Sequence, residues 1–125
     1  MLRTQWPVDV VLDEFTIPPG ESTGWHYHPV PILAVVRSGT LTRTLHDGTV
    51  EVSPPGTLFV EAAGRDRVHN GHNHGPVPVV LEVAYARPAD GTLTVPAEPP
   101  CCARTPARPG PPRTHTSRRI SPRTR

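Results

Sequence analysis

The sequence predicts an all-β domain over residues 1–98, followed by a tail, residues 99–125, of a different composition. Proline, glycine, aspartate and asparagine interrupt residues 1–98 at short intervals, and the segments between them are short and rich in β-branched side chains. Such segments favour strands over helices. A chain of 125 residues suits one modest core and is too short for two.

The positions of these turn-forming residues predict eight strands. We place them at residues 8–15, 22–28, 32–36, 40–46, 49–53, 57–61, 67–73 and 79–86. Along the last of them the side chains alternate, so that Val79, Leu81, Val83 and Tyr85 share one face, as in a half-buried strand. Eight short strands at this spacing indicate a sandwich, a jelly roll or a small barrel, and periodicity does not choose among the three.

Two segments carry more specific signals. The run ILAVV at residues 32–36 is apolar on both faces, which predicts a strand buried on two sides. Asp47 and Gly48 are the two-residue signal of a type I′ hairpin turn. Such a turn places Leu45 opposite Val50.

The tail differs from the domain in charge. Residues 1–98 carry six arginines and eleven acids, a net charge of −5, whereas residues 99–125 carry seven arginines and no acid, a net charge of +7. The tail also has seven prolines and a single large aliphatic side chain, Ile120, so it cannot bury enough apolar surface to offset the entropy lost on ordering. We expect a disordered Pro/Arg-rich basic tail that is solvated and has no specific partner. The alternative is that its charge attracts nucleic acid or anionic lipid without specificity.

Several function classes are not indicated. No apolar run approaches the roughly eighteen residues of a membrane span, and the start MLRTQWPVDVV lacks the basic-then-apolar order of a signal peptide, so we expect a soluble, cytoplasmic protein without a membrane partner. The adjacent Cys101 and Cys102 supply no disulfide framework. The sequence has no nucleotide fingerprint, no phosphate-binding glycine loop and no Ser-His-Asp order, and no nucleic-acid-binding signature precedes the tail.

The stretch GESTGWHYHP, residues 20–29, carries two histidines one residue apart. On a strand, His26 and His28 project to one face, and Trp25 and Tyr27 project to the other. Two imidazoles on one interior wall of a barrel can chelate one metal ion. The spacing alone is a weak signal of a metal site and fits exposed or hydrogen-bonded histidines better, so both interpretations are open at this point.

The same stretch resembles the first motif of the cupin family, G(X)5HXH(X)3,4E(X)6G. Gly20 is followed by five residues, His26, one residue, His28, three residues, Ile32, six residues and Gly39. Every spacing of the motif is met. The one departure in residue type is Ile32, which stands where the family has a glutamate.

The second motif of the family, G(X)5PXG(X)2H(X)3N, is present in altered form. Gly56 is followed by five residues, Ala62 in place of proline, one residue and Gly64. Four residues rather than two then precede His69, and Asn73 follows at the family's spacing. The resemblance covers roughly residues 8–95, and it implies a double-stranded β-helix, that is, a jelly-roll barrel.

The resemblance implies that His26, His28 and His69 are three metal-binding imidazoles. The missing glutamate leaves three possibilities for the site. It works as a three-histidine centre with open positions, as in some cupin dioxygenases; a carboxylate from elsewhere, with Glu61, Glu51 and Glu82 as the candidates, replaces the missing one; or the site holds no metal and the barrel is a binding cup.

Other side chains compete for these roles. The loop HNGHNHG brings His72 and His74 near His69, and such a loop can bind a metal weakly at the surface. The side chains of Thr40, Thr42 and Thr44 share a strand face, which either lines the cavity or is ordinary β-branched packing on an exposed face. Four arginines are candidates to anchor a substrate carboxylate: Arg37, Arg43, Arg65 and Arg67, the last two of which also flank Asp66 as a local ion-pair partner.

The sequence therefore predicts a small single-domain cupin that binds one divalent transition metal ion (Fe, Ni, Zn or Mn) through His26, His28 and His69. As an enzyme it would be a dioxygenase or an isomerase acting on a small polar molecule. The alternative is a metal-free, non-catalytic cupin that binds a small molecule. Cupins commonly pair through edge strands, so the resemblance also implies a homodimer.

Overall fold

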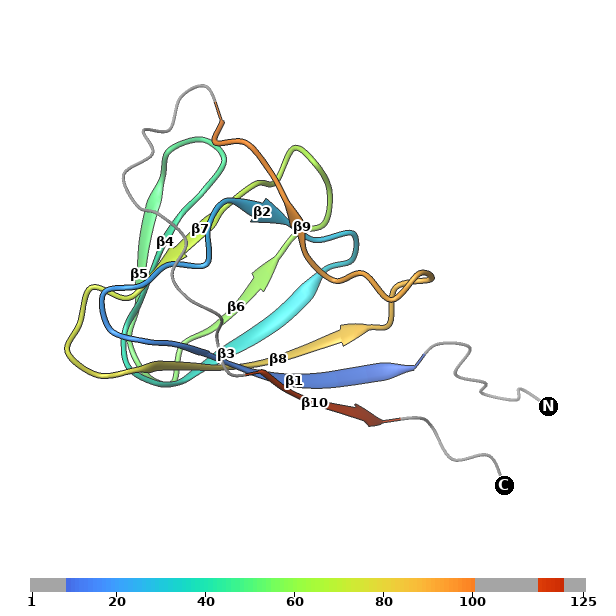
Figure 1. The fold of residues 1–125 in the computed structure, drawn as a ribbon, viewed down its shortest axis with the longest axis horizontal. Helices are drawn as coiled ribbons and strands as arrows, with labels where there is room; N and C mark the ends of the chain where they lie inside the picture. The colour runs from blue at the N-terminus through green and yellow to red at the C-terminus, as the bar shows by residue number, and fades with distance from the viewer. Residues whose placement is uncertain (1–8, 101–114, 121–125) are drawn as a thin grey trace.

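The structure is a computed structural model, and it describes residues 9–100 and the backbone of residues 115–120 (Figure 1). All regular elements of these residues are strands, which confirms the all-β prediction. They are β1 (Val10–Ile17), β2 (His26–Tyr27), β3 (Ile32–Ser38), β4 (Leu41–Thr44), β5 (Val50–Ser53), β6 (Leu58–Glu61), β7 (Asn70–His72), β8 (Val79–Ala86), β9 (Val95–Pro96) and β10 (His115–Ile120). The described residues contain no helix long and apolar enough to cross a membrane.

The strands form two layers that together make the predicted jelly-roll barrel. One layer is a five-stranded antiparallel sheet in the order β10-β1-β8-β3-β6. The other consists of the groups β5-β4-β7 and β2-β9, which are joined by the antiparallel bridges Ser22↔His72 and His26↔His69. Figure 1 shows this second layer above the long strands β1, β3 and β8.

The core lies between the two layers. The fully buried Ile17, Val36, Leu41 and Val79 form one apolar cluster, and Ile32, Ala34 and Val83 form a second. Leu81 and Tyr85 pack against these clusters from the same face of β8 as Val79 and Val83. The alternation predicted for residues 79–86 is thus confirmed.

The prediction that residues 32–36 are buried on both faces is wrong. Ile32, Ala34 and Val36 point into the core, but Leu33 on the other face of β3 is 44% exposed. Its neighbours on the adjacent edge strand, Leu58 and Val60, are exposed as well. Because the described residues of the second layer all lie on the inner side of this sheet, the outer face of β3 and β6 stays open although its side chains are apolar.

The predicted type I′ turn is also wrong. Val50 pairs with Thr44 rather than with Leu45, and the Leu45 amide donates to the Thr49 carbonyl at 2.8 Å. The Gly48 amide donates to the Leu45 carbonyl, and Gly48 has φ +86° while Asp47 does not have a positive φ. A type I′ turn requires a positive φ at both central residues, so this is a three-residue turn that ends on a left-handed glycine.

The remaining differences concern strand lengths and the tail. The expected strands 22–28 and 67–73 contract to β2 and β7, because the glycines and loops around them leave only short paired segments. β9 was not expected, since it is two residues long and contains proline. In the tail, residues 115–120 form β10, which pairs with β1 from Val10↔Ile120 to Phe15↔His115, so this part of the tail is a strand where no strand was expected. Cys101, Cys102 and the rest of the tail beyond residue 100 lie outside the described residues.

Candidate metal centre

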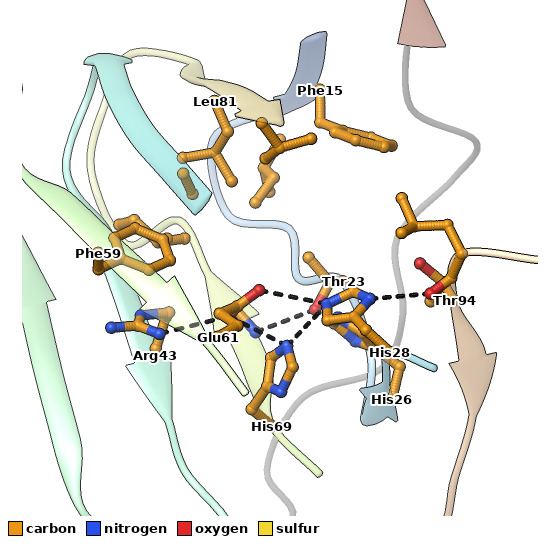
Figure 2. Close-up of a pocket in the computed structure, with 16 residues that line it drawn as sticks. Phe15, Thr23, His26, His28, Arg43, Phe59, Glu61, His69, Leu81 and Thr94 are labelled. Carbon is orange, nitrogen blue, oxygen red and sulfur yellow. Dashed lines mark hydrogen bonds and ion pairs between the residues drawn. The ribbon is translucent and has the colours of Figure 1, made fainter. Parts of the chain in front are cut away.

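The barrel contains a cavity that opens to solvent and offers about 100 Å³ of space to the centres of water-sized molecules, and Figure 2 shows the side chains that line it. The greater part of the lining is apolar and comes from β1, β3, β4, β6, β8 and the segment before β9. These side chains are Phe15, Ile17, Ala34, Leu41, Phe59, Leu81, Val83 and Leu93. The polar lining is gathered on one side of the cavity, where five charged or imidazole side chains meet: His26, His28, Arg43, Glu61 and His69.

The three histidines of the predicted site come together. His26, His28 and His69 are all buried, and each offers one ring nitrogen that lies within 4.8 Å of the others. The ring centroids are 4.4 Å apart for His26 and His69 and 4.9 Å apart for the other two pairs. The backbone explains this convergence, because His26 and His69 exchange amide-to-carbonyl hydrogen bonds of 3.0 and 2.9 Å between the β2 strand and the loop before β7.

Each histidine is oriented by a backbone carbonyl. The Nδ1 atom lies 2.8 Å from the Gly24 oxygen for His26, 3.0 Å from the Leu93 oxygen for His28, and 2.9 Å from the Arg67 oxygen for His69. A carbonyl oxygen only accepts hydrogen bonds, so Nδ1 carries the hydrogen in each ring. The Nε2 atom consequently has a free lone pair in the neutral form of each ring, and a ring that gains a second proton carries it on Nε2.

Glu61, on strand β6 of the five-stranded sheet, contacts two of the histidines. Its Oε1 atom is 3.2 Å from the His28 Nε2, and its Oε2 atom is 3.0 Å from the His69 Nε2. The same two nitrogens are 3.2 Å from each other. Glu61 lies on β6 directly opposite Ile32 on β3, so the carboxylate stands one strand away from the position where the family motif has its glutamate.

Arg43 holds this carboxylate from the other side, as Figure 2 shows. The Arg43 side chain is only 6% exposed, and its guanidinium donates to Glu61 at 3.3 Å and to Glu51 at 2.9 Å. It also lies over the Phe59 ring, 3.7 Å from the ring centroid. Arg43 therefore links the cavity to Glu51, which is 46% exposed at the surface.

The environment changes the protonation of these groups. Burial, together with His69 and His28, lowers the pKa of His26 to about 3. Burial alone would raise the pKa of the Glu61 carboxyl, but the hydrogen bonds from His28 and His69 outweigh it and hold that pKa well below its usual range. Burial would lower the pKa of His69, yet the hydrogen bond and the charge of Glu61 prevail and raise it. The site thus combines a neutral His26 with an ionised Glu61 at neutral pH.

The competing histidines do not reach this cluster. His72 is buried by its bridge to Ser22, and its ring stacks on the exposed His74 with centroids 5.2 Å apart. Burial and the neighbouring His74 lower the pKa of His72. Neither ring lines the cavity, so the pair is separate from the three-histidine cluster.

The other candidates divide by strand face. On β4, Leu41 and Arg43 point into the cavity, whereas Thr40, Thr42 and Thr44 do not line it, which favours the packing interpretation of the threonines. Arg37 pairs with Glu82 at 3.4 Å on the outside of the barrel. Arg65 and Arg67 are exposed, and the ion pairs found among the described residues do not join either of them to Asp66.

Some features of the site have no signal in the sequence. The Leu93 carbonyl that orients His28 lies 65 residues further along the chain, in a segment without regular structure. The position of Glu61 depends on the register of β6 against β3, which the sequence pattern does not fix. Only the presence of Glu61 among the three candidate carboxylates could be read in advance.

Comparisons with known proteins agree with the jelly-roll fold. Residues 13–85 match the family profile of the cupin domain (Cupin_2). A protein with a double-stranded beta-helix domain from Klebsiella pneumoniae subsp. pneumoniae MGH 78578 has a similar structure, with a TM-score of 0.60 and 24% identity over 72% of this chain and 76% of that one. No protein with curated annotation is significantly similar in sequence.

Two enzymes are also among the similar structures. The polyketide cyclase RemF from Streptomyces resistomycificus has a TM-score of 0.57 and 25% identity over 63% of this chain and 55% of that one. A sugar phosphate isomerase of the cupin superfamily from Silicibacter pomeroyi has a TM-score of 0.56 and 22% identity over 63% of this chain and 51% of that one. The chain thus aligns with about half the length of each enzyme.

Proposed function

The chain belongs to the cupin-domain family, and we propose that it binds one divalent transition metal ion through the Nε2 atoms of His26, His28 and His69 and acts on a small molecule beside that ion. The observation that carries the proposal is the convergence of three buried imidazoles whose Nδ1 atoms all donate to backbone carbonyls. Metal-binding histidines characteristically donate their second ring nitrogen in this way.

The distances within the cluster support the proposal. Donor atoms bound to one transition metal ion at about 2.0–2.2 Å are themselves about 3.0–3.4 Å apart in octahedral or tetrahedral arrangements. The His28 and His69 Nε2 atoms are 3.2 Å apart, within that range. Two neutral rings that both carry hydrogen on Nδ1 have no hydrogen to share at this contact, so either a metal cation or a further proton on one ring accounts for it.

Imidazole nitrogen suits ions of the first-row transition metals, and the ion that we propose is Fe, Ni, Zn or Mn, among which the ligands do not choose. When bound, such an ion supplies a Lewis acid that polarises an oxygen or an enolate of a substrate.

The cavity indicates what kind of molecule could lie beside the ion. The apolar wall that includes Phe15 and Leu81 faces the polar side across the cavity. A substrate with a compact apolar body and one polar, metal-chelating end would fit both walls. Oxygenation and isomerisation are the reaction classes we propose, since each acts on such a polar end.

The alternative is a metal-free cupin that binds a small molecule without catalysis. The observation in its favour is the contact of the Glu61 carboxylate with His69 at 3.0 Å, together with the raised pKa of His69. A proton on His69 would hold the carboxylate in place without a metal ion. The two functions differ in whether the three Nε2 atoms bind a metal.

Metal content decides between them. We would measure metals by plasma mass spectrometry on full-length protein purified without a histidine tag, for the wild type, for His26→Ala/His69→Ala, and for His72→Ala/His74→Ala as a control with the same number of histidines removed. The proposal predicts about one equivalent of a transition metal in the wild type and the control, and none in the first variant. Circular dichroism would verify that the variants fold. Absence of metal from the wild type after reconstitution would contradict the proposal.

Assembly as a homodimer and a cytoplasmic location are part of the same proposal. The open apolar face of Leu33, Leu58 and Val60 supports association with a second copy, since exposed apolar sheet faces commonly mark interaction surfaces.

A further inference from the structure

We propose that Glu61 is the fourth, anionic ligand of the metal centre and that Arg43 positions it. This inference rests on the proposed function, because it concerns the ion bound by the three histidines. In this chain the acidic ligand comes from β6 rather than from β3. On β3, Ile32 stands at the position of the family's glutamate, and Glu61 is its direct partner on β6.

The first support is distance. The two carboxylate oxygens of Glu61 are 3.2 Å from the His28 Nε2 and 3.0 Å from the His69 Nε2. Both values match the separation of about 3.0–3.4 Å between neighbouring donors of one ion. The structure therefore places the carboxylate at the same spacing from two imidazoles as those imidazoles have from each other.

The second support is the chemistry of the contacting atoms. Oε1 and Oε2 of an ionised carboxylate only accept hydrogen bonds, and the Nε2 atoms of His28 and His69 are acceptors as well when the rings are neutral and their Nδ1 atoms donate to Leu93 and Arg67. Acceptors that converge in a buried site repel one another unless a cation, either a metal ion or a proton on an imidazole, lies among them. A divalent ion satisfies all of them at once.

The third support is charge. Arg43 has a single positive charge and contacts two carboxylates, with the shorter distance, 2.9 Å, to Glu51 and the longer, 3.3 Å, to Glu61. The Glu61 side chain is only 12% exposed, so water does little to stabilise its charge. One guanidinium thus leaves the pair of carboxylates with one excess negative charge, which a metal cation at the histidines would neutralise.

Strand register makes the relocation possible. Ile32 and Glu61 are cross-strand partners in the antiparallel β3–β6 pair, so their side chains lie on the same face. The Cβ atoms of such partners are about 4.5–5.5 Å apart, a separation that a glutamate side chain can span. A carboxylate at either position can therefore reach the same point between the histidines.

The test exchanges the carboxylate between the two strands. Zinc affinity would be measured by competition with a chelating dye for the wild type, Glu61→Gln, Ile32→Glu/Glu61→Gln and, as a control, Glu82→Gln. Glu82 was another candidate carboxylate, but it pairs with Arg37 on the outside of the barrel. We expect Glu61→Gln to bind zinc at least about ten-fold more weakly, the double variant to regain most of the affinity, and Glu82→Gln to match the wild type.

The outcomes separate this inference from the proposed function. If the wild type binds no zinc, the proposed function fails and Glu61 has no ligand role. If the wild type binds zinc, His69→Ala does not, and Glu61→Gln binds as tightly as the wild type, the three-histidine site stands and the ligand role of Glu61 is refuted. A weakened Glu61→Gln that Ile32→Glu fails to restore, in a double variant that folds with a normal thermal midpoint, would also overturn the relocation.

Discussion

Ile32 and Glu61 face each other across the β3–β6 strand pair, and both side chains point to the inside of the barrel. In the family motif the position of Ile32 belongs to a glutamate, whereas here the glutamate is on the paired strand and contacts two of the three histidines. The loss of an acidic residue in the motif is thus accompanied by an acidic residue at the nearest point on the neighbouring strand.

Metal removal should lower the stability of the wild type. A ligand that binds only the folded state stabilises it by about 4 kcal/mol when its concentration is about 1,000 times its Kd. We expect the thermal midpoint to rise on addition of zinc and to fall after chelation, and the His26→Ala/His69→Ala variant to show neither change. Differential scanning calorimetry would measure the midpoints. A variant that responded to zinc like the wild type would place the ion elsewhere.

Replacing Arg43 should destabilise the metal-free protein strongly. Its guanidinium is buried against Glu61, Glu51 and the Phe59 ring, so Arg43→Met would leave the Glu61 carboxylate without its cation. We expect a loss of about 3–5 kcal/mol in the free energy of unfolding, as for other broken buried pairs. The Arg37→Met control removes an ion pair of which Arg37 is 62% exposed, and it should lose less than about 1 kcal/mol. If urea unfolding gave equal losses of stability for Arg43→Met and Arg37→Met, the buried Glu61 carboxylate would not need the charge of Arg43.

A methyl group at Gly39 should disrupt the turn between β3 and β4. Gly39 has φ +73°, and a Cβ there would lie 2.5 Å from the Pro78 oxygen and 2.8 Å from the Val79 Cα. Both contacts are with backbone, so Gly39→Ala should lower the free energy of unfolding by about 2–4 kcal/mol through strain and overpacking.

Gly56→Ala provides the matched control for that strain. Gly56 has φ +90°, and a Cβ there would meet nothing within 4 Å. Only the left-handed backbone is then unfavourable, and the loss should be about 1–2 kcal/mol. Urea unfolding of both variants would check the difference, and a Gly39→Ala variant no worse than Gly56→Ala would contradict the close approach of residues 78–79.

Because of Tyr85, the free energy of unfolding should decrease at alkaline pH. Burial raises the pKa of the Tyr85 phenol, and the hydrogen bond to the buried Asp13 raises it further. The unfolded chain loses the phenol proton near about pH 10, while the folded chain keeps it to higher pH. The contribution of Tyr85 is therefore complete below about pH 10 and is lost as the pH rises through the folded pKa.

Comparison with Tyr85→Phe isolates this effect, because the chain has no lysine and the other titrating groups are common to both proteins. Urea unfolding at about pH 8 and about pH 11 should show a larger loss of stability in the wild type. Identical losses in the two proteins would mean that the Tyr85 phenol titrates alike in the folded and unfolded chains.

The sequence predicted the features that depend on local order. The positions of most strands follow from proline and glycine punctuation, and the convergence of His26, His28 and His69 follows from motif spacing once the barrel is assumed. The hairpin at Asp47 and Gly48 shows the limit of such signals. The same dipeptide serves a two-residue turn and a three-residue turn, and the choice shifts the register by one residue.

The features that were missed depend on contacts between distant segments. The pairing of Ile32 with Glu61 requires the register of β6 against β3, and the Leu93 carbonyl that orients His28 belongs to an irregular segment. The outward exposure of Leu33 depends on which side of the sheet the second layer covers. None of these relationships produces a periodic pattern of residues in the sequence.

Anomalous diffraction from crystals of the full-length protein soaked with zinc would test the central claim most directly. The account predicts one strong anomalous peak in the cavity, at about 2.0–2.2 Å from the Nε2 atoms of His26, His28 and His69. A cavity without a peak, or a peak only at the stacked His72 and His74, would contradict the claim that these three histidines form a metal centre.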